Sequence, residues 1–239
     1  MTENNNFLKG IKDGLPICIG YFAVAFAFGI TAVQCGLTWV EALLISVTNL
    51  TSAGQLAGVP IIAGGGSLIE MAVSQLVINS RYALMSVSLS QKFGKSVKLP
   101  HRFLFSFTNT DEVFAVAMTN KNPVGKKFMF GLSLTPPIGW TLGTLFGAIA
   151  DNILPAIVIS ALGVAIYGMF VAIVVPEMKH KKPIRLCVFF AVALSCAFYY
   201  IPVLKTIPSG FVIIICAVLA STLFAVAYPI PAEEGQADD

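Results

Sequence analysis

The stretch SVTNLTSAGQLAGVP, residues 46–60, lies between strongly apolar runs and raises the first question about the fold. With WVEALLI before it and IIA after it, the segment has the length of one membrane-spanning helix. Its centre nevertheless carries Thr48, Asn49, Thr51, Ser52 and Gln55, together with glycines and a proline. Broken backbone at membrane depth is tolerated only where protein or water covers it. Segment 40–63 is therefore predicted to be a discontinuous helix that borders a cavity.

The composition defines the class of protein. Hydrophobic residues make up 56% of the 239 residues and charged residues only 11%, and the mean hydropathy is +0.83. Soluble domains carry about 25% charged residues, so this chain has too few to cover a water-facing surface. Long apolar runs without short alternating strands argue against a β-barrel. We expect an all-α integral membrane protein, a polytopic helical bundle.

Six runs are long and apolar enough to cross a bilayer, which needs about 20 residues each. They are 15–34, 68–90, 128–150, 153–176, 185–203 and 209–229. Two further segments, 40–63 and 103–119, are apolar at both ends and polar in the middle. The chain is expected to form one transmembrane transport domain over residues 1–231, followed by a short acidic, disordered tail at 232–239.

The basic residues test this topology. They cluster at 9–12, 92–102, 121–127 and 179–185. If segment 40–63 crossed the membrane fully, the basic loop 91–102 would face outward, against the positive-inside rule. If 40–63 and 103–119 each enter and leave on one side, every basic cluster and the N terminus face the cytoplasm. The sequence therefore predicts about six full spans plus two discontinuous or re-entrant segments.

The spacing Ser52-x-x-Gln55 is that of a capping box, in which each side chain satisfies a backbone amide at a helix N terminus. It predicts a second half-helix that begins near Ala53, after a break at 49–51. The free amides of such an N terminus, including that of Gly54, suit a carboxylate. The alternative is that small and polar residues merely let neighbouring helices pack closely.

The second segment, FLFSFTNTDEVFAVAMT at 103–119, repeats the design. Asn109-x-x-Glu112 and Thr108-x-x-Asp111 are capping-type spacings, and the two adjacent acids lie between apolar flanks. An aspartate at the bilayer centre costs roughly 2.5–3.5 kcal/mol, so such groups usually face a cavity and have a function. Asp111 and Glu112 are candidate proton-coupling residues. An interfacial loop with ordinary solvated acids is the alternative.

The run 68–90 carries a polar stripe, in which Glu70, Ser74 and Arg81 share one helical face and Asn79 lies beside it. An arginine in a membrane helix suits bidentate binding of a carboxylate. The alternative is a structural role, in which Arg81 ties down a carbonyl or the Asp111/Glu112 pair. Six residues are candidate substrate ligands: Ser52, Gly54, Gln55, Asn79, Arg81 and Asn109.

The sequence offers little for a cofactor or metal. Five cysteines lack CxxC spacing, both histidines lie in basic loops, and no Walker motif is present. The leading hypothesis is a secondary transporter of a small charged or zwitterionic solute, without a cofactor and without enzymatic activity. A passive channel, a carrier of another small anion or zwitterion, and a membrane-embedded enzyme that uses Asp111 and Glu112 as an acid pair are the alternatives.

Two apolar stretches also resemble each other. GLPICIGYFAVAFAFG at 14–29 and SLTPPIGWTLGTLFG at 133–147 share a proline, a Gly-aromatic pair and a final Phe-Gly. Many transporters are built from internal repeats, although matches of Gly, Pro and Phe also arise by chance in apolar helices.

Four motifs together resemble the AzlC family. They are GYFAVAFAFGITAVQCGLT (20–38), SAGQ (52–55), INSRYALMS (78–86) and TDEVFA (110–115). These proteins are the large subunits of two-component bacterial exporters of branched-chain amino acids, and the resemblance runs from about residue 14 to 175. It implies export of hydrophobic amino acids across the bacterial cytoplasmic membrane, driven by the proton gradient, with a small AzlD-type membrane subunit. The chain departs from the family in TNLTSAG, where an aromatic residue is common, and in Tyr82 after Arg81.

Overall fold

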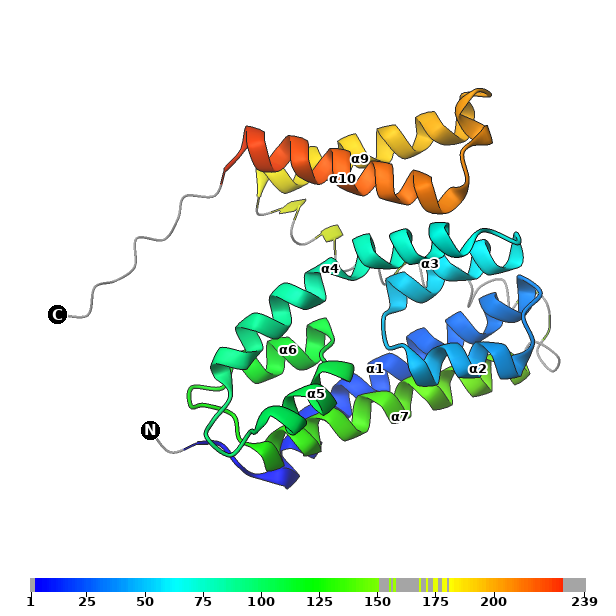
Figure 1. Cartoon of the computed structure of the whole chain (residues 1–239). Coiled ribbons are helices and arrows are strands. Elements are labelled where there is room, and N and C mark those ends of the chain that lie inside the picture. The colour runs from blue at the N-terminus through cyan, green and yellow to red at the C-terminus, as the bar shows by residue number, and fades with distance from the viewer. Residues whose placement is uncertain are drawn as a thin grey trace. The chain divides into compact units, whose positions relative to one another are not determined.

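The structure of the chain is a computed structural model that describes residues 3–150 and 181–229, together with positions 155, 157, 168, 171, 174–175 and 178–179. Every regular element in these described parts is a helix (Figure 1). Two isolated bridges, Asn4 to Val124 and Phe93 to Val124, are the extended pairings found there. The chain forms two compact units, Met1–Phe170 and Val171–Asp239. The expectation of an all-α protein is confirmed.

Unit 1 is built on two helices that lie side by side, α1 (Phe7–Gln34) and α7 (Lys126–Ala150) (Figure 1). A Cβ atom added at Gly139, Gly143 or Gly147 would overlap the carbonyl oxygen of Cys18, Phe22 or Phe26, respectively. Only glycine therefore permits this close approach of the two backbones. Because the contacts advance in the same direction along both helices, α1 and α7 are parallel and begin at the same end of unit 1.

The two stretches that resemble each other in sequence form the middle of this helix pair. Tyr21 of α1 and Trp140 of α7, the aromatic residues that follow the matched glycines, pack edge to face with ring centroids 5.2 Å apart. Such pairs contribute about 0.5–1.5 kcal/mol beyond the area that they bury. The resemblance of the two stretches thus corresponds to two parallel helices in direct contact.

Each of the two polar-centred segments forms a pair of short helices. The first comprises α2 (Trp39–Thr48) and α3 (Ser52–Ala63), and the second comprises α5 (Leu99–Phe107) and α6 (Asp111–Met118). In each pair the chain doubles back at the break between the helices (Figure 1). The predicted breaks in both segments are confirmed. The long helix α4 (Leu68–Lys92) connects the two pairs and runs between the two ends of unit 1.

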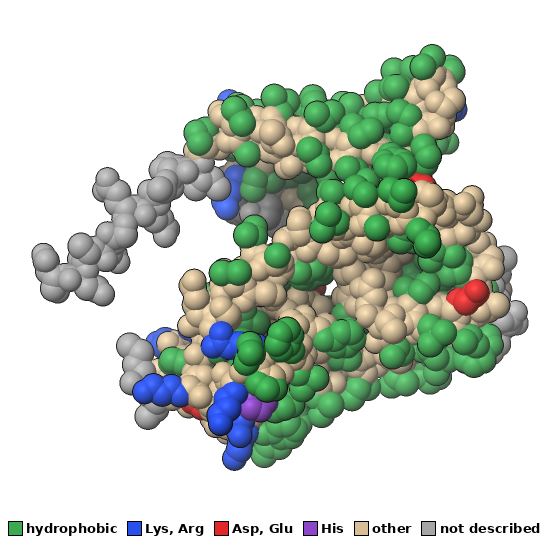
Figure 2. Space-filling model, in the orientation of Figure 1, with side chains coloured by type: hydrophobic (Ala, Val, Ile, Leu, Met, Phe, Trp, Pro, Cys, Tyr) green, Lys and Arg blue, Asp and Glu red, His purple; other side chains and the backbone are tan. Residues whose placement is uncertain are grey.

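Hydrogen bonds tie three chain segments together where α1 begins. Asn4 N donates to Pro123 O at 2.8 Å, Gly125 N donates to Asn4 O at 2.7 Å, and Gly94 N donates to Val124 O at 2.8 Å. Figure 2 shows Lys and Arg side chains gathered at this end of unit 1, and we call it the basic end. It brings together three of the predicted basic clusters, 9–12, 92–102 and 121–127.

Unit 2 contains a helical hairpin. Helix α9 (Lys182–Tyr200) is followed by a 3₁₀ turn, η1 (Leu204–Thr206), and by α10 (Ser209–Ala227). The Phe190 and Phe224 rings lie 5.9 Å apart across this hairpin. The helices agree with the predicted spans 185–203 and 209–229. The predicted span 153–176, apart from scattered positions, and the acidic tail at 232–239 lie outside the described residues.

Among the described residues, three helices combine the length and the hydropathy of a membrane span: Phe7–Gln34, Lys182–Tyr200 and Gly210–Ala227. Helices α4 and α7 have 25 residues each, enough to cross a bilayer. Their hydropathy is lower because α4 carries the polar stripe and α7 carries Lys, Ser, Thr and Pro residues among its apolar ones. A membrane protein is thus supported, whereas the count of six spans stays a prediction.

Candidate functional site

At the first break, between α2 and α3, the N-cap is the residue that precedes the predicted cap, Ser52. Thr51 is the N-cap of α3 and its hydroxyl accepts from Gly54 N at 3.3 Å. The Asn49 side chain accepts from Thr51 N at 3.0 Å. The predicted Ser52–Gln55 capping box is therefore wrong, since Ser52 is already the first helical residue. The half-helix itself begins one residue before the predicted start.

Gln55 belongs to a buried hydrogen-bond network instead. Trp140 Nε1 donates to Gln55 Oε1 at 3.0 Å, and Gln55 Nε2 donates to Ser46 Oγ at 3.0 Å. Ser46 Oγ in turn shares a hydrogen bond of 2.7 Å with Thr144 Oγ1. All four side chains are at most 2% exposed. The network fixes α2 and α3 against α7, and it occupies both ends of the Gln55 amide.

Sequence reasoning missed the partners of Gln55. The one signal was Trp140, because a buried indole N–H usually has an acceptor. Gly54 also has a structural role, since the Gln75 side chain of α4 donates to Gly54 O at 2.9 Å. A Cβ at Gly54 would lie 2.6 Å from Gln75 Oε1, which is too close. Ser52, Gly54 and Gln55 therefore shape the first turn of α3 beside the break.

At the second break, between α5 and α6, fewer of the polar groups have hydrogen-bond partners. Thr110 is the N-cap of α6, but its side chain makes no capping hydrogen bond. The predicted capping roles of Thr108 and Asn109 are therefore wrong: Thr108 Oγ1 donates to Phe105 O, and Asn109 Nδ2 donates to Ser86 Oγ at 3.0 Å. Thr110 Oγ1 and Asn109 Oδ1 are buried and have no hydrogen-bond partner in the structure.

The two adjacent carboxylates of α6 contact different helices. Asp111 forms an ion pair with Arg81 of α4, and Glu112 accepts a hydrogen bond from the Tyr21 hydroxyl of α1. The structure contains the contact named as the alternative for Arg81, in which it ties down the Asp111/Glu112 pair, and it does so through Asp111. Arg81 of α4 and Asp111 of α6 are 30 residues apart in sequence, and the fold brings them into contact. Arg81 also lies 4.8 Å from the centre of the Tyr82 ring.

A cavity of about 210 Å³ lies where the two breaks meet. Helix α4 contributes Asn79 and Tyr82 to its wall. The breaks and the helix ends beside them contribute the rest: Thr48, Asn49, Leu50, Thr51, Ser106, Phe107, Asn109 and Thr110. The structure thus joins two segments that the sequence predicted separately. We call this space the junction cavity.

Several polar atoms in the lining of the junction cavity are buried and have no hydrogen-bond partner. Three of its residues, Asn79, Asn109 and Thr110, each have a buried side-chain oxygen without a hydrogen-bond partner. Leaving such a group unsatisfied costs about 1–3 kcal/mol, so these atoms are typical of a site that binds a polar ligand. Pockets for drug-sized ligands measure about 300–1,000 Å³. The smaller volume here suits a small solute.

The other predicted site residues surround this cavity. Arg81 and Asp111 are the chain neighbours of the lining residues Tyr82 and Thr110. Their side chains are 44% and 49% exposed, so the ion pair is accessible. Glu70 and Ser74 of the predicted stripe are buried within unit 1. In the described parts of the chain, no group of three or more His, Cys, Asp or Glu side chains is placed to hold a metal ion.

The family model described as AzlC protein matches residues 16–154, which include both breaks, Arg81 and the two carboxylates. The chain belongs to the AzlC family. AzlC membership places the junction cavity and the ion pair inside the part of the chain that defines the family.

Curated relatives agree with this assignment. The inner membrane protein YgaZ of Escherichia coli is 30% identical over 190 residues, which cover 76% of each protein. An uncharacterized membrane protein of Archaeoglobus fulgidus is 31% identical over 183 residues, covering 76% of this AzlC chain and 80% of the relative. No solved structure matches the chain. These comparisons support a membrane protein of the AzlC family.

Proposed function

We propose that this protein is a secondary transporter that exports branched-chain or other hydrophobic amino acids across the bacterial cytoplasmic membrane, coupled to the proton gradient. The observation that carries the proposal is the junction cavity, because two broken helices meet there around buried polar atoms without partners. Discontinuous helices whose ends border a small cavity are typical of transporter binding sites. The resemblance to the AzlC family supplies the substrate class.

The Arg81–Asp111 ion pair suggests how a zwitterion is recognised. An amino acid carries one carboxylate and one ammonium, the charges that complement Arg81 and Asp111. In the proposed cycle the substrate separates the pair: its carboxylate binds the guanidinium of Arg81 and its ammonium binds Asp111. Arginine suits this role because its planar donors bind a carboxylate bidentately. A solute with one charge alone would leave the other residue unpaired, so both charges are required.

The N termini of α3 and α6 favour the same orientation. Both helices begin directly after residues that line the junction cavity, Thr51 and Thr110. Amides in the first turn of a helix have no partner within the helix and carry partial positive charge. They add to the attraction of Arg81 for the substrate carboxylate. The oxygen atoms of Asn79 and Asn109 are acceptors for the ammonium group.

The charge at the ends of unit 1 supports a proposal for its orientation in the membrane. Helices α1 and α7 both begin at the basic end, and α4 finishes there. We propose that this end faces the cytoplasm, in accord with the positive-inside rule. The α2–α3 and α5–α6 pairs would then be re-entrant, one from each side, and would meet at the junction cavity.

We also propose that the chain works with a small AzlD-type membrane subunit and that it catalyses no chemical reaction. The resemblance to the AzlC family supports the partner. The requirement for a partner is tested by producing the chain with and without that subunit in the same cells. Transport that needs both proteins supports the proposal, and full transport by the chain alone contradicts it.

The test of the function is efflux of labelled leucine, isoleucine, valine and methionine from preloaded cells, with and without an imposed proton gradient. We expect gradient-dependent efflux that the four amino acids compete for. Counterflow, in which unlabelled leucine on one side accelerates labelled leucine from the other, separates a carrier from a channel. The proposal is wrong if cells that contain both subunits show no efflux beyond cells that lack them.

A further inference from the structure

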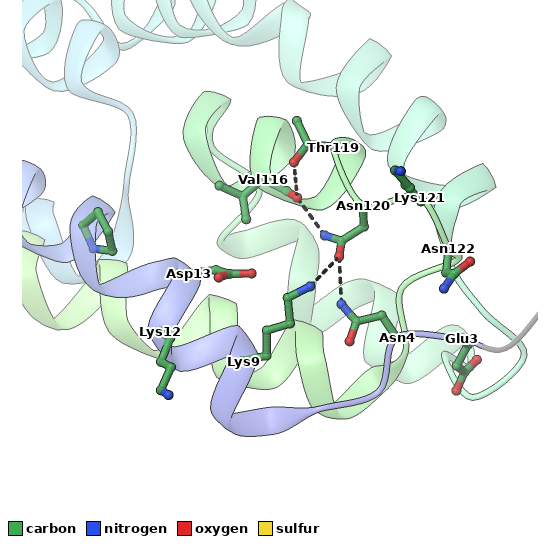
Figure 3. A pocket seen from close by; sticks show the side chains of 11 residues that line it. Glu3, Asn4, Lys9, Lys12, Asp13, Val116, Thr119, Asn120, Lys121 and Asn122 are labelled. Carbon is green, nitrogen blue, oxygen red and sulfur yellow. Dashed lines mark hydrogen bonds between the residues drawn. The ribbon is translucent and has the colours of Figure 1, made fainter.

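A second, larger cavity of about 800 Å³ lies at the basic end, between the first turns of α1 and the end of α6 (Figure 3). We call it the basic-end cavity. Helix α1 contributes Lys9, Lys12, Asp13 and Pro16, and α6 and the chain after it contribute Val116, Thr119, Asn120, Lys121 and Asn122. Glu3 and Asn4 of the N-terminal segment complete the wall. Its lining is mostly polar, so the cavity is suited to hold water.

The charged groups of this cavity have different surroundings. The titratable side chains in its lining are Glu3, Lys9, Lys12, Asp13 and Lys121. Lys9 Nζ donates to Asn120 Oδ1 at 3.5 Å and lies 5.9 Å from the centre of the Phe128 ring. Figure 3 shows the Asp13 carboxylate directed into the space between α1 and α6. Among the contacts of the described residues, Asp13 has no hydrogen bond or ion pair.

The basic-end cavity approaches Glu112 along α6. Val116 lines the cavity, and Glu112 lies four residues earlier on the same face of the helix. At 1.5 Å per residue, about 6 Å separates them along the helix axis. The Tyr21 hydroxyl bonds to Glu112, and the Tyr21 ring packs on Trp140. This contact holds Glu112 against α1, where Tyr21 lies five residues beyond the lining residue Pro16.

The surroundings of the two adjacent carboxylates differ. Asp111 forms an ion pair with Arg81, whose guanidinium carries a permanent positive charge. Glu112 faces the neutral Tyr21 hydroxyl of α1. The other charged or titratable groups nearby are Asp111 on the same helix and Arg81 and Tyr82 on α4. Because Arg81 is engaged by Asp111, Glu112 is the carboxylate of the pair without a cationic partner among these groups.

We propose that the basic-end cavity is the aqueous proton path to Glu112 and that Asp13 is the relay carboxylate within it. The proposal rests on the proposed function, since it assumes proton-coupled transport. During export the proton leaves the Glu112 carboxyl when the Tyr21 contact opens, crosses cavity water and protonates Asp13. Asp13 then passes the proton to water, which becomes hydronium at the basic end. Glu112 and Asp13 each return to the carboxylate form, so no other reactant is needed.

The experiment compares leucine movement with proton movement. The full chain, together with its small subunit, is reconstituted in lipid vesicles that contain a pH-sensitive dye. Labelled leucine counterflow at equal pH measures carrier activity, and the dye measures proton flux driven by a leucine gradient. The variants are Asp13→Asn, which removes the carboxylate, and Asp13→Glu, which keeps it. Glu3→Gln is the matched control, because Glu3 lines the same cavity and accepts from Ser96 N at 3.3 Å.

We expect Asp13→Asn to keep leucine counterflow within about twofold of the wild type and to lose at least about tenfold of the leucine-driven proton flux. Asp13→Glu and Glu3→Gln should keep both. Unchanged proton flux in Asp13→Asn overturns the proposal, as does equal loss in Asp13→Asn and Asp13→Glu. Failure of the proposed function itself is distinguishable, because the wild-type protein would then move no leucine.

Discussion

The two broken helix pairs of unit 1 look alike in the sequence and differ in the structure. At the first break, Thr51 caps α3, Asn49 binds the backbone of Thr51, and Gln55 joins a closed network. At the second break, Asn109 and Thr110 retain buried oxygens without partners. The first break carries no charge, and the second is followed at once by Asp111 and Glu112.

This difference assigns different roles to the two pairs. A fully satisfied buried network rigidifies its surroundings, so the α2–α3 pair forms the fixed wall of the junction cavity. The α5–α6 pair is held at its break by contacts that other charges or hydrogen bonds can replace: Arg81 to Asp111 and Tyr21 to Glu112. Within the proposed function, the α5–α6 pair is the part that responds to substrate and proton.

The largest effect is expected from Arg81→Ala, which removes the proposed carboxylate ligand. Two charge-assisted hydrogen bonds contribute about 1.5 kcal/mol each, so leucine affinity should fall about 100-fold. The measurement is leucine binding to purified protein, together with efflux from cells. Arg102→Ala is the matched control, because Arg102 lies over the Phe93 ring at the basic end, 5.6 Å from its centre, and should keep normal affinity.

Wild-type efflux in Arg81→Ala would contradict the role of the ion pair in recognition. Loss of membrane insertion is excluded by comparing the amount of each variant in the membrane fraction.

The next effect separates the two acids of the second break. Glu112→Gln should keep leucine counterflow but lose at least about tenfold of leucine-driven proton flux, because an amide cannot release a proton. Asp111→Asn should instead weaken leucine binding and leave the proton flux per leucine unchanged. Counterflow and proton flux in the same vesicles measure both. If the two variants behave identically, the assignment of different roles to the two acids is wrong.

The sequence predicted the helices and both breaks well, because each depends on local signals. Runs of apolar residues defined α1, α4, α7, α9 and α10, and clustered Thr, Asn and Ser residues marked where the short helices separate. The predicted caps were wrong because TNLTSAGQ and TNTDE each offer several residues that can cap a helix. Local spacing alone could not choose among them.

The site depends on contacts that local patterns do not contain. Trp140 reaches Gln55 across 85 positions of sequence, and Tyr21 reaches Glu112 across 91. A glutamine that looked like a capping residue therefore became the centre of a network. Arg81 could be predicted as a site residue, because arginine is rare in a membrane helix, but its pairing with Asp111 was one alternative among several. The junction cavity required the whole fold of unit 1.

A third prediction tests the first break as a fixed wall. Gln55→Ala leaves buried Trp140 Nε1 without its acceptor and Ser46 without its donor, at about 1–3 kcal/mol for each group. We expect a clear fall in the midpoint of thermal aggregation in detergent. Gln91→Ala is the matched control, because Gln91 is exposed on α4 and its replacement should change stability by less than about 0.5 kcal/mol. Equal midpoints for the two variants would contradict the proposal that the first break forms a fixed wall of the junction cavity.

The smallest effect compares the two N-cap threonines directly. Thr51→Val removes a capping hydrogen bond and should lower stability by about 1 kcal/mol. Thr110→Val removes a buried hydroxyl that has no hydrogen-bond partner, so stability should stay the same or rise, by up to about 1–3 kcal/mol. If Thr110 Oγ1 binds the substrate, leucine affinity should nevertheless fall about threefold to tenfold, equivalent to one hydrogen bond.

Thermal midpoints and leucine binding measured on both valine variants give the two comparisons in one experiment. A loss of stability in Thr51→Val and a loss of affinity in Thr110→Val is the expected pattern, because the first hydroxyl is used by the fold and the second is left for a ligand. Equal losses of stability would mean that the second break is as fully satisfied as the first. Unchanged affinity in Thr110→Val would remove its hydroxyl from the proposed binding site and leave Asn79 and Asn109 as the polar ligands there.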